Sequence, residues 1–260
     1  MASKLAIVTG ASTGIGFELA HLIAQSGYDL LVVADEPLIQ ASARDFETHG
    51  VSVQAVEADL ATIAGVDQLL VAAQGRPIDI LCANAGVGTG GAFLGQDLAR
   101  WRHAIDTNIT GTVYLLQKVL KDMVARGEGK VLVTGSIAGY VPGAFNAVYN
   151  GTKAFLDNFT EALRNELKDI DGVTLTTLMP GPTETEFFER ADMLDTKVAH
   201  DQKADPAKVA KDGWEALLAG KGHIVSGLLN KLQVAGAGII PQSVLAEQHR
   251  KMAEPGSQKD

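Results

Sequence analysis

The sequence predicts an α/β fold: a single domain built on a doubly wound, seven-stranded parallel sheet with helices on both faces. Three observations support this prediction. Segments of strand and helix character alternate along the chain, several strands are short and apolar on both faces, and the composition does not shift abruptly anywhere. Alternating strands and crossover helices form parallel sheets, which are buried on both faces. A length of 260 residues suits one large domain of this kind.

Seven segments have strand character. The first is a run of four apolar residues that ends at Thr9-Gly10, as expected for a buried strand. The third alternates between apolar and polar residues from Val51 to Val56, which is typical of a half-buried strand. The predicted strands cover residues 5–8, 30–33, 51–56, 78–82, 130–134, 173–178 and 223–226.

Helices are predicted between these strands, and local signals mark their ends. Gly27 and Gly50 stop the first two helices, and Pro37 suits the first turn of the second. We expect the fourth helix to bend near Gly111 and the last eight residues of the chain to be disordered. The predicted helices cover residues 17–26, 37–49, 62–74, 97–126, 147–170, 205–219 and 241–252.

Composition excludes several classes of protein. A net charge of −9 argues against nucleic acid as the main partner. We identify no signal peptide, and no apolar stretch reaches the ~18 residues of a membrane span. The single Cys82 excludes an intrachain disulfide and suits a reducing compartment, so we expect a cytoplasmic protein. The six histidines show no metal-ligand spacing, so no metal site is predicted.

A glycine-rich turn follows the first strand. Gly10, Gly14 and Gly16 stand between that strand and the first helix, where backbone N–H groups and a helix N-terminus can bind phosphate. The spacing is Gly-x-x-x-Gly-x-Gly, which differs from the general dinucleotide fingerprint. The alternative is a purely structural turn, but the position after the first strand favours a nucleotide.

Tyr149 and Lys153 lie one turn apart on one face of a predicted helix. A free phenol has a pKa near ~10 and is a poor acid–base catalyst at neutral pH. A lysine charge at roughly 5 Å in an effective dielectric of ~20 would favour the phenolate by about 3 kcal/mol. We therefore expect Lys153 to lower the pKa of Tyr149. The alternative for this pair alone is an ordinary helix surface with a half-buried ring.

Taken together, these motifs resemble a known family. The segment from Thr9 to Gly16, the triplet that begins at Asn84, and the residues Asn108, Ser136 and Tyr149-x-x-x-Lys153 occur in the order and spacing of the short-chain dehydrogenase/reductases. The resemblance extends over residues 5–226. It implies a Rossmann-like sheet of seven strands, and it implies hydride transfer between NAD or NADP and a carbonyl or alcohol.

The resemblance also implies site residues. Asn108, Ser136, Tyr149 and Lys153 would be catalytic. Tyr149 would exchange a proton with the substrate oxygen, Ser136 would polarise that oxygen, Lys153 would also hold the nicotinamide ribose, and Asn108 would hold a relay water. The residues implied in cofactor binding are Gly10, Ser12, Gly14, Ile15, Gly16, Asp35, Asp59, Leu60, Asn84, Ala85, Gly86, Tyr149, Lys153, Pro180, Gly181, Thr183 and Thr185.

Structural roles remain alternatives for some of these residues. Ser136 and Asp59 could each cap a helix, and Asn108 could mark a helix kink. The polar insert at residues 183–204 carries Phe187, Phe188, Met193 and Leu194. We expect a mobile substrate lid there, with ordinary core as the alternative. Domain organisation follows: residues 1–226 form the dinucleotide-binding and catalytic domain, and residues 227–260 form a C-terminal extension of unassigned role.

Asp35 determines the expected cofactor. It stands at the end of the second strand, 19 residues after Gly16, where a carboxylate accepts hydrogen bonds from the adenosine ribose hydroxyls. Neither the glycine loop nor the end of that strand carries a basic residue for a 2′-phosphate, so NAD is predicted and NADP is disfavoured. The alternative is that Asp35 only caps the helix that starts near Pro37.

The predicted function is therefore an oxidoreductase that moves hydride between NAD(H) and a small-molecule secondary alcohol or ketone. The alternatives are an isomerase or dehydratase that uses bound NAD transiently, and a nucleotide-sensing protein without turnover. We also expect a homo-oligomer, a dimer or tetramer, because the helices at 97–126 and 147–170 are apolar on more than one face. The alternative is that the segment from Gly227 onward covers that apolar surface.

Overall fold

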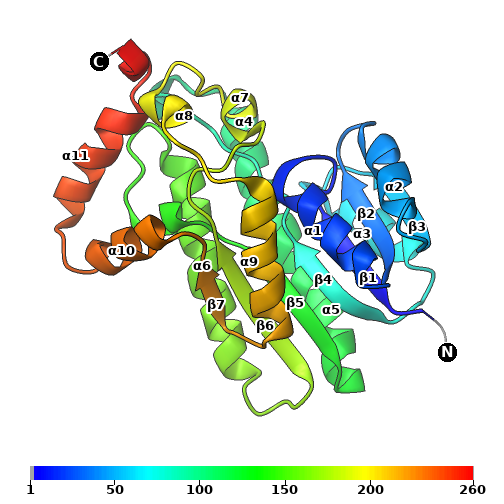
Figure 1. The fold of residues 1–260 in the computed structure, drawn as a ribbon. Coiled ribbons are helices and arrows are strands. Elements are labelled where there is room, and N and C mark those ends of the chain that lie inside the picture. Colours follow the sequence, from blue (N-terminus) through cyan, green and yellow to red (C-terminus); the bar gives the residue numbers. More distant parts are fainter. Residues whose placement is uncertain (1–2, 260) are drawn as a thin grey trace.

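The structure, a computed structural model, describes residues 3–259 (Figure 1). Seven parallel strands form one sheet in the order β3-β2-β1-β4-β5-β6-β7. This arrangement confirms the predicted doubly wound sheet. The strands are β1 (Leu5–Thr9), β2 (Asp29–Ala34), β3 (Val53–Glu57), β4 (Ile78–Ala83), β5 (Gly129–Thr134), β6 (Val173–Met179) and β7 (His223–Val225).

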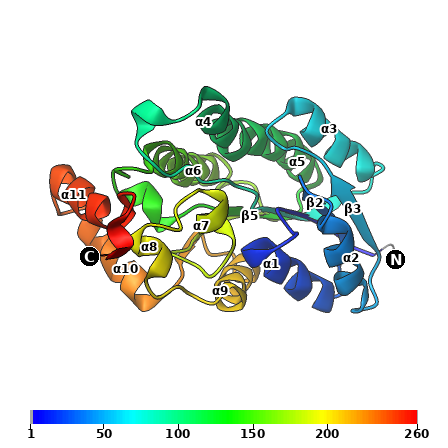
Figure 2. The same cartoon turned by 90° about the horizontal axis from the view of Figure 1, so that it is seen from above.

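Helices cover the sheet on both faces, as the view from above in Figure 2 shows. Eleven α-helices lie within the described residues, and α3, α5 and α6 lie on the opposite face from α1, α2 and α9. The helices are α1 (Gly14–Gln25), α2 (Ile39–Glu47), α3 (Ile63–Ala72), α4 (Leu98–Ile105), α5 (Thr112–Arg126), α6 (Ala147–Glu166), α7 (Phe187–Arg190), α8 (Lys197–His200), α9 (Pro206–Leu218), α10 (Leu228–Ala237) and α11 (Gln242–Ala253).

Apolar side chains fill both sides of the sheet. On one face, Leu115 and Leu116 of α5 pack on the strands, and on the other Leu19 of α1 and Trp214 of α9 do so. Every residue of β1 and β2 is buried, because helices cover these central strands on both faces of the sheet. The short apolar runs in the sequence reflect this burial.

The strand order creates the site. It reverses between β1 and β4, which are neighbours in the sheet although β2 and β3 separate them in the chain. Crevices at the carboxyl ends of strands beside such a reversal bind ligands in open α/β sheets. Gly10, Asn84 and Ser136 follow β1, β4 and β5 at this edge.

The long helix predicted at 97–126 is divided in the structure. A π-helical segment, η2 (Asp106–Gly111), separates α4 from α5 and contains Asn108. Gly111 is needed there because a Cβ at this position would overlap the Leu60 carbonyl. The helix is therefore interrupted at the place where a bend was predicted, and Asn108 lies within this π-helical segment.

The C-terminal extension differs from the sequence prediction. Residues 228–237 form α10, for which no helix was predicted, and α10 packs on the short 3-10 helix η3 (Ile137–Tyr140) while α11 packs on α8. The last eight residues were expected to be disordered, but Ala253 is buried and Ser257–Lys259 form a 3-10 turn, η4. The amides of Gly256 and Gln258 bond to Asp195, which holds this end of the chain; Asp260 lies outside the described residues.

Candidate active site

A cavity of about 510 Å³ opens at the carboxyl edge of the sheet. Loops after six strands, the segment at residues 183–204 and both C-terminal helices contribute to it. It brings together nearly all the sequence-predicted site residues: Gly10, Ser12, Gly14, Ile15, Asp35, Asp59, Leu60, Asn84, Ala85, Gly86, Ser136, Tyr149, Lys153, Pro180, Gly181, Thr183 and Thr185. Of the predicted residues, Gly16 and Asn108 do not line it.

The glycine turn has the backbone geometry of a ligand cradle. Gly10 and Gly14 adopt φ of 64° and 61°, a region that favours glycine. A Cβ at Gly10 would lie 2.9 Å from Ala85 Cα, and one at Gly14 would lie 2.8 Å from Thr185 Cγ2. Gly16 has a packing role, because a Cβ there would overlap the Gly10 carbonyl. The turn therefore brings bare backbone to the cavity wall beneath the N-terminus of α1.

Asn84 and Asn108 hold the loop after β4. The Asn84 amide donates to the Thr9 and Gly10 carbonyls at 3.1 and 3.3 Å, which ties β4 to the glycine turn. Asn108 is fully buried and exchanges two bonds with Val87, of 2.8 and 2.9 Å, while its amide also donates to Thr152. Both ends of the Asn108 side chain are therefore engaged with protein, so its side chain positions the loop against α6.

Ser136, Tyr149 and Lys153 converge on one part of the cavity. Ser136 follows β5, is 6% exposed, and accepts a bond from the Ala138 amide at 3.1 Å, so it is also the cap of η3. Lys153 is buried and donates to the Thr134 carbonyl at 2.7 Å. Its Nζ lies 5.8 Å from the centre of the Tyr149 ring. The four-residue spacing on α6 therefore places Tyr149 and Lys153 in the same cavity, as predicted.

Burial controls the protonation of this cluster. It raises the pKa of Tyr149 to about 12, although hydrogen bonding from Ser136 lowers it. It lowers the pKa of Lys153 to about 8, although the carboxylate of Asp157 raises it. The net pKa shift of Tyr149 is therefore upward, because desolvation of the phenolate is its largest cause, and a lowering by Lys153 stays a prediction.

Asp157 is a buried acid that the sequence analysis missed. It stands one turn after Lys153 on α6. Within the described residues, neither of its carboxylate oxygens makes a hydrogen bond of normal geometry. Burial raises the pKa of Asp157 to about 7, against the opposing effects of Lys153 and the Ser136 amide. Its position four residues after Lys153 is the only sequence signal that could have pointed to it.

Residues 183–204, the segment expected to be a lid, line part of the cavity. A bridge between Thr183 and Ala204 joins the two ends of this segment, and Phe188 and Met193 are buried within it. The Phe187 ring lies 4.8 Å from the Tyr149 ring. Leu194 is 54% exposed, so the insert is neither wholly core nor wholly surface. Gly88 and Gly90, in the loop after β4, let the lid approach closely, because a Cβ at either would collide with Phe187 or Met193.

The C-terminal extension supplies the remaining wall. Leu229, Asn230 and Gln233 of α10 and His249 and Met252 of α11 all line the cavity. The Nδ1 atom of His249 lies 2.9 Å from the Ala144 carbonyl, in the loop that precedes α6. No sequence motif identifies these residues, because their positions depend on the packing of α10 on η3 and of α11 on α8.

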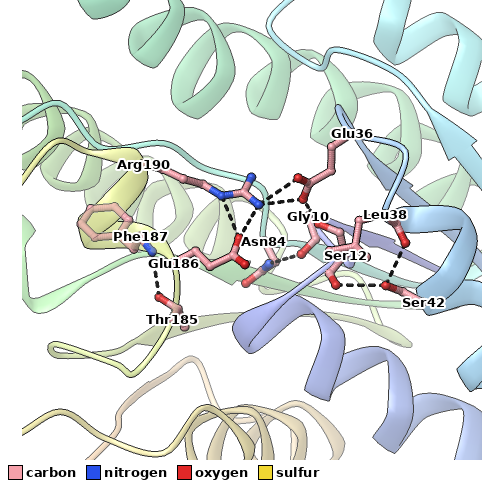
Figure 3. A network of polar contacts seen from close by, with 10 residues as sticks. All are labelled: Gly10, Ser12, Glu36, Leu38, Ser42, Asn84, Thr185, Glu186, Phe187 and Arg190. Atoms are coloured by element: carbon pink, nitrogen blue, oxygen red, sulfur yellow. Dashed lines mark hydrogen bonds and ion pairs between the residues drawn. The ribbon is translucent and has the colours of Figure 1, made fainter.

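Charged side chains join the lid to the opposite rim (Figure 3). Arg190, the last residue of α7, contacts both carboxylate oxygens of Glu36 at 2.8 and 2.9 Å. Glu36 also accepts a bond of 2.5 Å from the Ser12 hydroxyl in the glycine turn. Arg190 is the basic residue that the sequence analysis did not find near Asp35, because it comes from a segment 154 residues further along the chain.

The capping alternatives for the two aspartates do not hold. Leu38 is the N-cap residue of α2, and Asp35 is exposed at the cavity edge. Thr62 caps α3 through the Gly65 amide, while Asp59 accepts a bond from the Ala61 amide within the preceding turn. Both aspartates therefore remain available on the cavity side.

The residues present fit a nicotinamide dinucleotide. Bare glycine backbone and a helix N-terminus suit a pyrophosphate, and the Asp35 carboxylate suits ribose hydroxyls. Within residues 3–259 no group of three or more His, Cys, Asp or Glu could hold a metal ion. In the same part of the chain, none of the helices combines the length and the apolar character that a bilayer crossing requires.

Comparison with known proteins agrees with this geometry. The family described as short chain dehydrogenase matches residues 4–194. An uncharacterized oxidoreductase of Myxococcus xanthus is 37% identical over 192 residues, which make up 72% of this chain and 75% of that protein. Human 17-beta-hydroxysteroid dehydrogenase type 1 is 36% identical over 208 residues, 73% of this chain and 60% of that protein.

Solved structures lead to the same family. A short-chain dehydrogenase from Sphingobium yanoikuyae in complex with NADPH superposes with a TM-score of 0.80 and 26% identity, covering 92% of this chain and 97% of that one. The family match covers most of the chain, and the cavity brings together the residues by which the sequence resembled that family. The chain therefore belongs to the short-chain dehydrogenase/reductase family of oxidoreductases.

Proposed function

We propose that this protein transfers hydride between NAD(H) and a secondary alcohol or ketone, with Tyr149 as the general acid and base. The observation that carries the proposal is the convergence of Ser136, Tyr149 and Lys153 in the same cavity as the glycine turn. A phenol, a hydroxyl and an ammonium at one point can bind and protonate an oxygen that gains negative charge.

Each residue has a distinct task in this mechanism. The nicotinamide, when bound, supplies or accepts the hydride. Ser136 donates a hydrogen bond to the substrate oxygen, and Tyr149 gives that oxygen a proton during reduction. A pKa of about 12 keeps the Tyr149 phenol protonated at neutral pH, so the site is ready to act as an acid. Lys153, with a pKa of about 8, is largely charged at pH 7 and offsets the negative charge that develops on the phenol.

The substrate that fits is bulky and largely apolar. The segment at residues 183–204 and the C-terminal helices contribute apolar side chains to the cavity that contains Tyr149, which are Phe187, Phe188, Met193, Val198, Leu229 and Met252. The human relative is named for a hydroxysteroid, a substrate of the same character. Residues 183–204 would act as the lid that closes over it, with Phe187 against Tyr149.

His249 is one of the polar residues on the wall that the C-terminal helices supply. The Ala144 carbonyl can only accept a hydrogen bond, so Nδ1 of His249 carries the proton. Burial lowers the pKa of His249, although the bond to Ala144 raises it, so the ring is neutral at pH 7. Its Nε2 is then an acceptor on the cavity wall. We infer that a hydroxyl or amine donor at the far end of the substrate would bind there.

Asp35 supports NAD as the cofactor. Asp35 is the first residue after β2 and lines the cavity, where its carboxylate can accept hydrogen bonds from ribose hydroxyls. The related structure from Sphingobium yanoikuyae binds NADPH. The proposed choice of NAD therefore rests on this chain's own carboxylate.

One experiment tests the function. The purified protein is screened against secondary alcohols and ketones of increasing size with NAD(H) and NADP(H), while nicotinamide absorbance is followed at 340 nm. Turnover with NAD(H) that Tyr149→Phe abolishes supports the proposal. Tight cofactor binding together with no absorbance change on any alcohol or ketone would favour an isomerase, a dehydratase or a sensor and would refute it.

A further inference from the structure

Figure 3 shows the ion pair between Arg190 and Glu36 beside Ser12 of the glycine turn, at the end of the cavity where the proposed function places the adenosine. Ser12, which bonds to Glu36, lines that end together with Asp35, the residue before Glu36 in the chain. Arg190 itself also lines the cavity. A lid residue thus faces the position at which NAD carries a ribose hydroxyl and NADP carries a phosphate.

Two carboxylates engage the Nε and Nη2 atoms of the Arg190 guanidinium. Nη2 contacts both oxygens of Glu36, and Nε and Nη2 contact Glu186 Oε2 at 3.1 and 2.5 Å. The local groups are three carboxylates, those of Asp35, Glu36 and Glu186, and one guanidinium. The sum of these formal charges is negative. A phosphate placed here would meet repulsion and would have to compete with Glu36 and Glu186 for Nε and Nη2 of Arg190.

We propose that Glu36 is a second determinant of cofactor choice, which acts by occupying Arg190 and Ser12. While Glu36 is ionised, it keeps the guanidinium and the hydroxyl from an incoming phosphate. Arginine binds phosphate and carboxylate through the same N–H groups, so a 2′-phosphate would compete with the Glu36 carboxylate for Nη2 of Arg190. This inference rests on the proposed function only in that the cavity binds a nicotinamide dinucleotide.

The lowered pKa of Glu36 agrees with this geometry. Burial raises it, but the Ser12 hydroxyl and the Arg190 guanidinium lower it further than burial raises it. Glu36 is therefore ionised at neutral pH. Its side chain is 27% exposed and that of Arg190 is 44% exposed, so the pair is accessible to a competing ligand.

The test is a binding cycle that needs no substrate. NAD⁺ and NADP⁺ are titrated by calorimetry into the wild type, Glu36→Gln, Arg190→Gln and the double variant. Glu36→Gln should lower the dissociation constant for NADP⁺ relative to that for NAD⁺ by about tenfold. The reason is that one negative charge is removed and Nη2 of Arg190 no longer contacts a carboxylate. The double variant should lose most of that gain, because the released donor is gone.

A matched control separates this effect from net charge. Glu184→Gln removes one carboxylate from the same lid, where Glu184 pairs with Lys203 at 3.2 Å and does not line the cavity. It should leave the ratio of the two dissociation constants unchanged within about twofold. Unchanged NAD⁺ binding by Glu36→Gln would show that the variant is folded.

The outcomes distinguish the two proposals. If both cofactors bind but Glu36→Gln leaves their ratio unchanged, the role of Glu36 is refuted and the proposed function stands. The same holds if the single and the double variant gain NADP⁺ affinity equally, because Arg190 would then not receive the phosphate. If the wild type binds neither cofactor, the proposed function fails and this inference fails with it.

Discussion

Replacement of Asp157 by asparagine should change how the stability of the protein depends on pH. Asp157 is packed between two glycines of the loop that carries Ser136: a Cβ at Gly135 would overlap Oδ1, and one at Gly139 would lie 2.5 Å from Oδ2. The carboxylate therefore has little room for water and, among the described residues, no regular hydrogen-bond donor. Asparagine keeps the shape of the side chain and removes the charge.

The magnitude follows from the shift in pKa. The folded protein raises the pKa of Asp157 from its ordinary 3.8 to about 7, so between these values the folded state binds a proton that the unfolded state has lost. The stabilising contribution is fully present below pH 3.8 and is lost as pH rises through 7. A shift of about 3 units corresponds to roughly 4 kcal/mol of unfolding free energy.

Urea denaturation at pH 5 and pH 7.5 measures this effect. The wild type should lose more unfolding free energy between these two pH values than Asp157→Asn, by about 2–3 kcal/mol, because part of the transition lies below pH 5. His21 and His249 titrate in the same range, but they do so in both proteins and cancel in the difference. Asp122→Asn, at an exposed position paired with Arg126, is the control. Equal pH dependence in the wild type and Asp157→Asn would show that this carboxylate is solvated.

Four further outcomes are expected. Tyr149→Phe should lose roughly 10²–10⁴-fold in turnover while cofactor affinity is retained, and near-normal turnover on a good substrate would remove Tyr149 from the mechanism. Asp35→Arg should narrow or reverse a preference for NAD of about 10–150-fold, equivalent to 1.5–3 kcal/mol; tighter NADP binding by the wild type would contradict this. Removal of residues 241–260 should raise KM for bulky substrates more than for small ones, because His249 and Met252 of the cavity wall are lost, whereas an equal change for both would show that α11 only stabilises the fold. A homo-oligomer, dimer or tetramer, should form, and sedimentation of a single 27.3 kDa species at micromolar concentration would exclude it.

A partly exposed aromatic pair on α6 is the proposed contact surface for the expected oligomer. Phe155 on α6 is 40% exposed and stacks on Phe159 at 5.5 Å between ring centres. The alternative was that the C-terminal extension covers the apolar surface of the long helices. Its main contacts are instead with η3 and α8, which argues against that alternative. A second copy of the chain remains the proposed partner of that surface.

Much of the catalytic geometry could be predicted because it depends on local spacing. Tyr149 and Lys153 share a helix, and the residues that follow β1, β4 and β5 meet at one edge because the sheet is parallel. The glycine turn needs positive φ at Gly10 and Gly14, which the residue type itself signals. Helix ends were less accurate, as at Glu166, where α6 stops four residues before the predicted end at Ile170.

Other features required the folded chain. The direction of the Tyr149 pKa shift depends on how much protein surrounds the phenol, which the pair spacing does not reveal. The burial of Asp157 depends on the glycines of a neighbouring loop rather than on its own helix. Order in the last residues depends on bonds to Asp195 in the lid, and a short polar tail carries no signal for such partners.

The sheet, the glycine turn, the cluster of Ser136, Tyr149 and Lys153, and the family could all be inferred from the amino-acid sequence, because strand periodicity, glycine positions and helical spacing act over a few residues. What surrounds the two ends of the cavity could be seen only in the folded chain. Arg190 reaches Glu36 across 154 residues, and α10 and α11 form the substrate wall after the last motif. Contacts of this kind arise when separate segments pack together, so no local pattern in the chain encodes them.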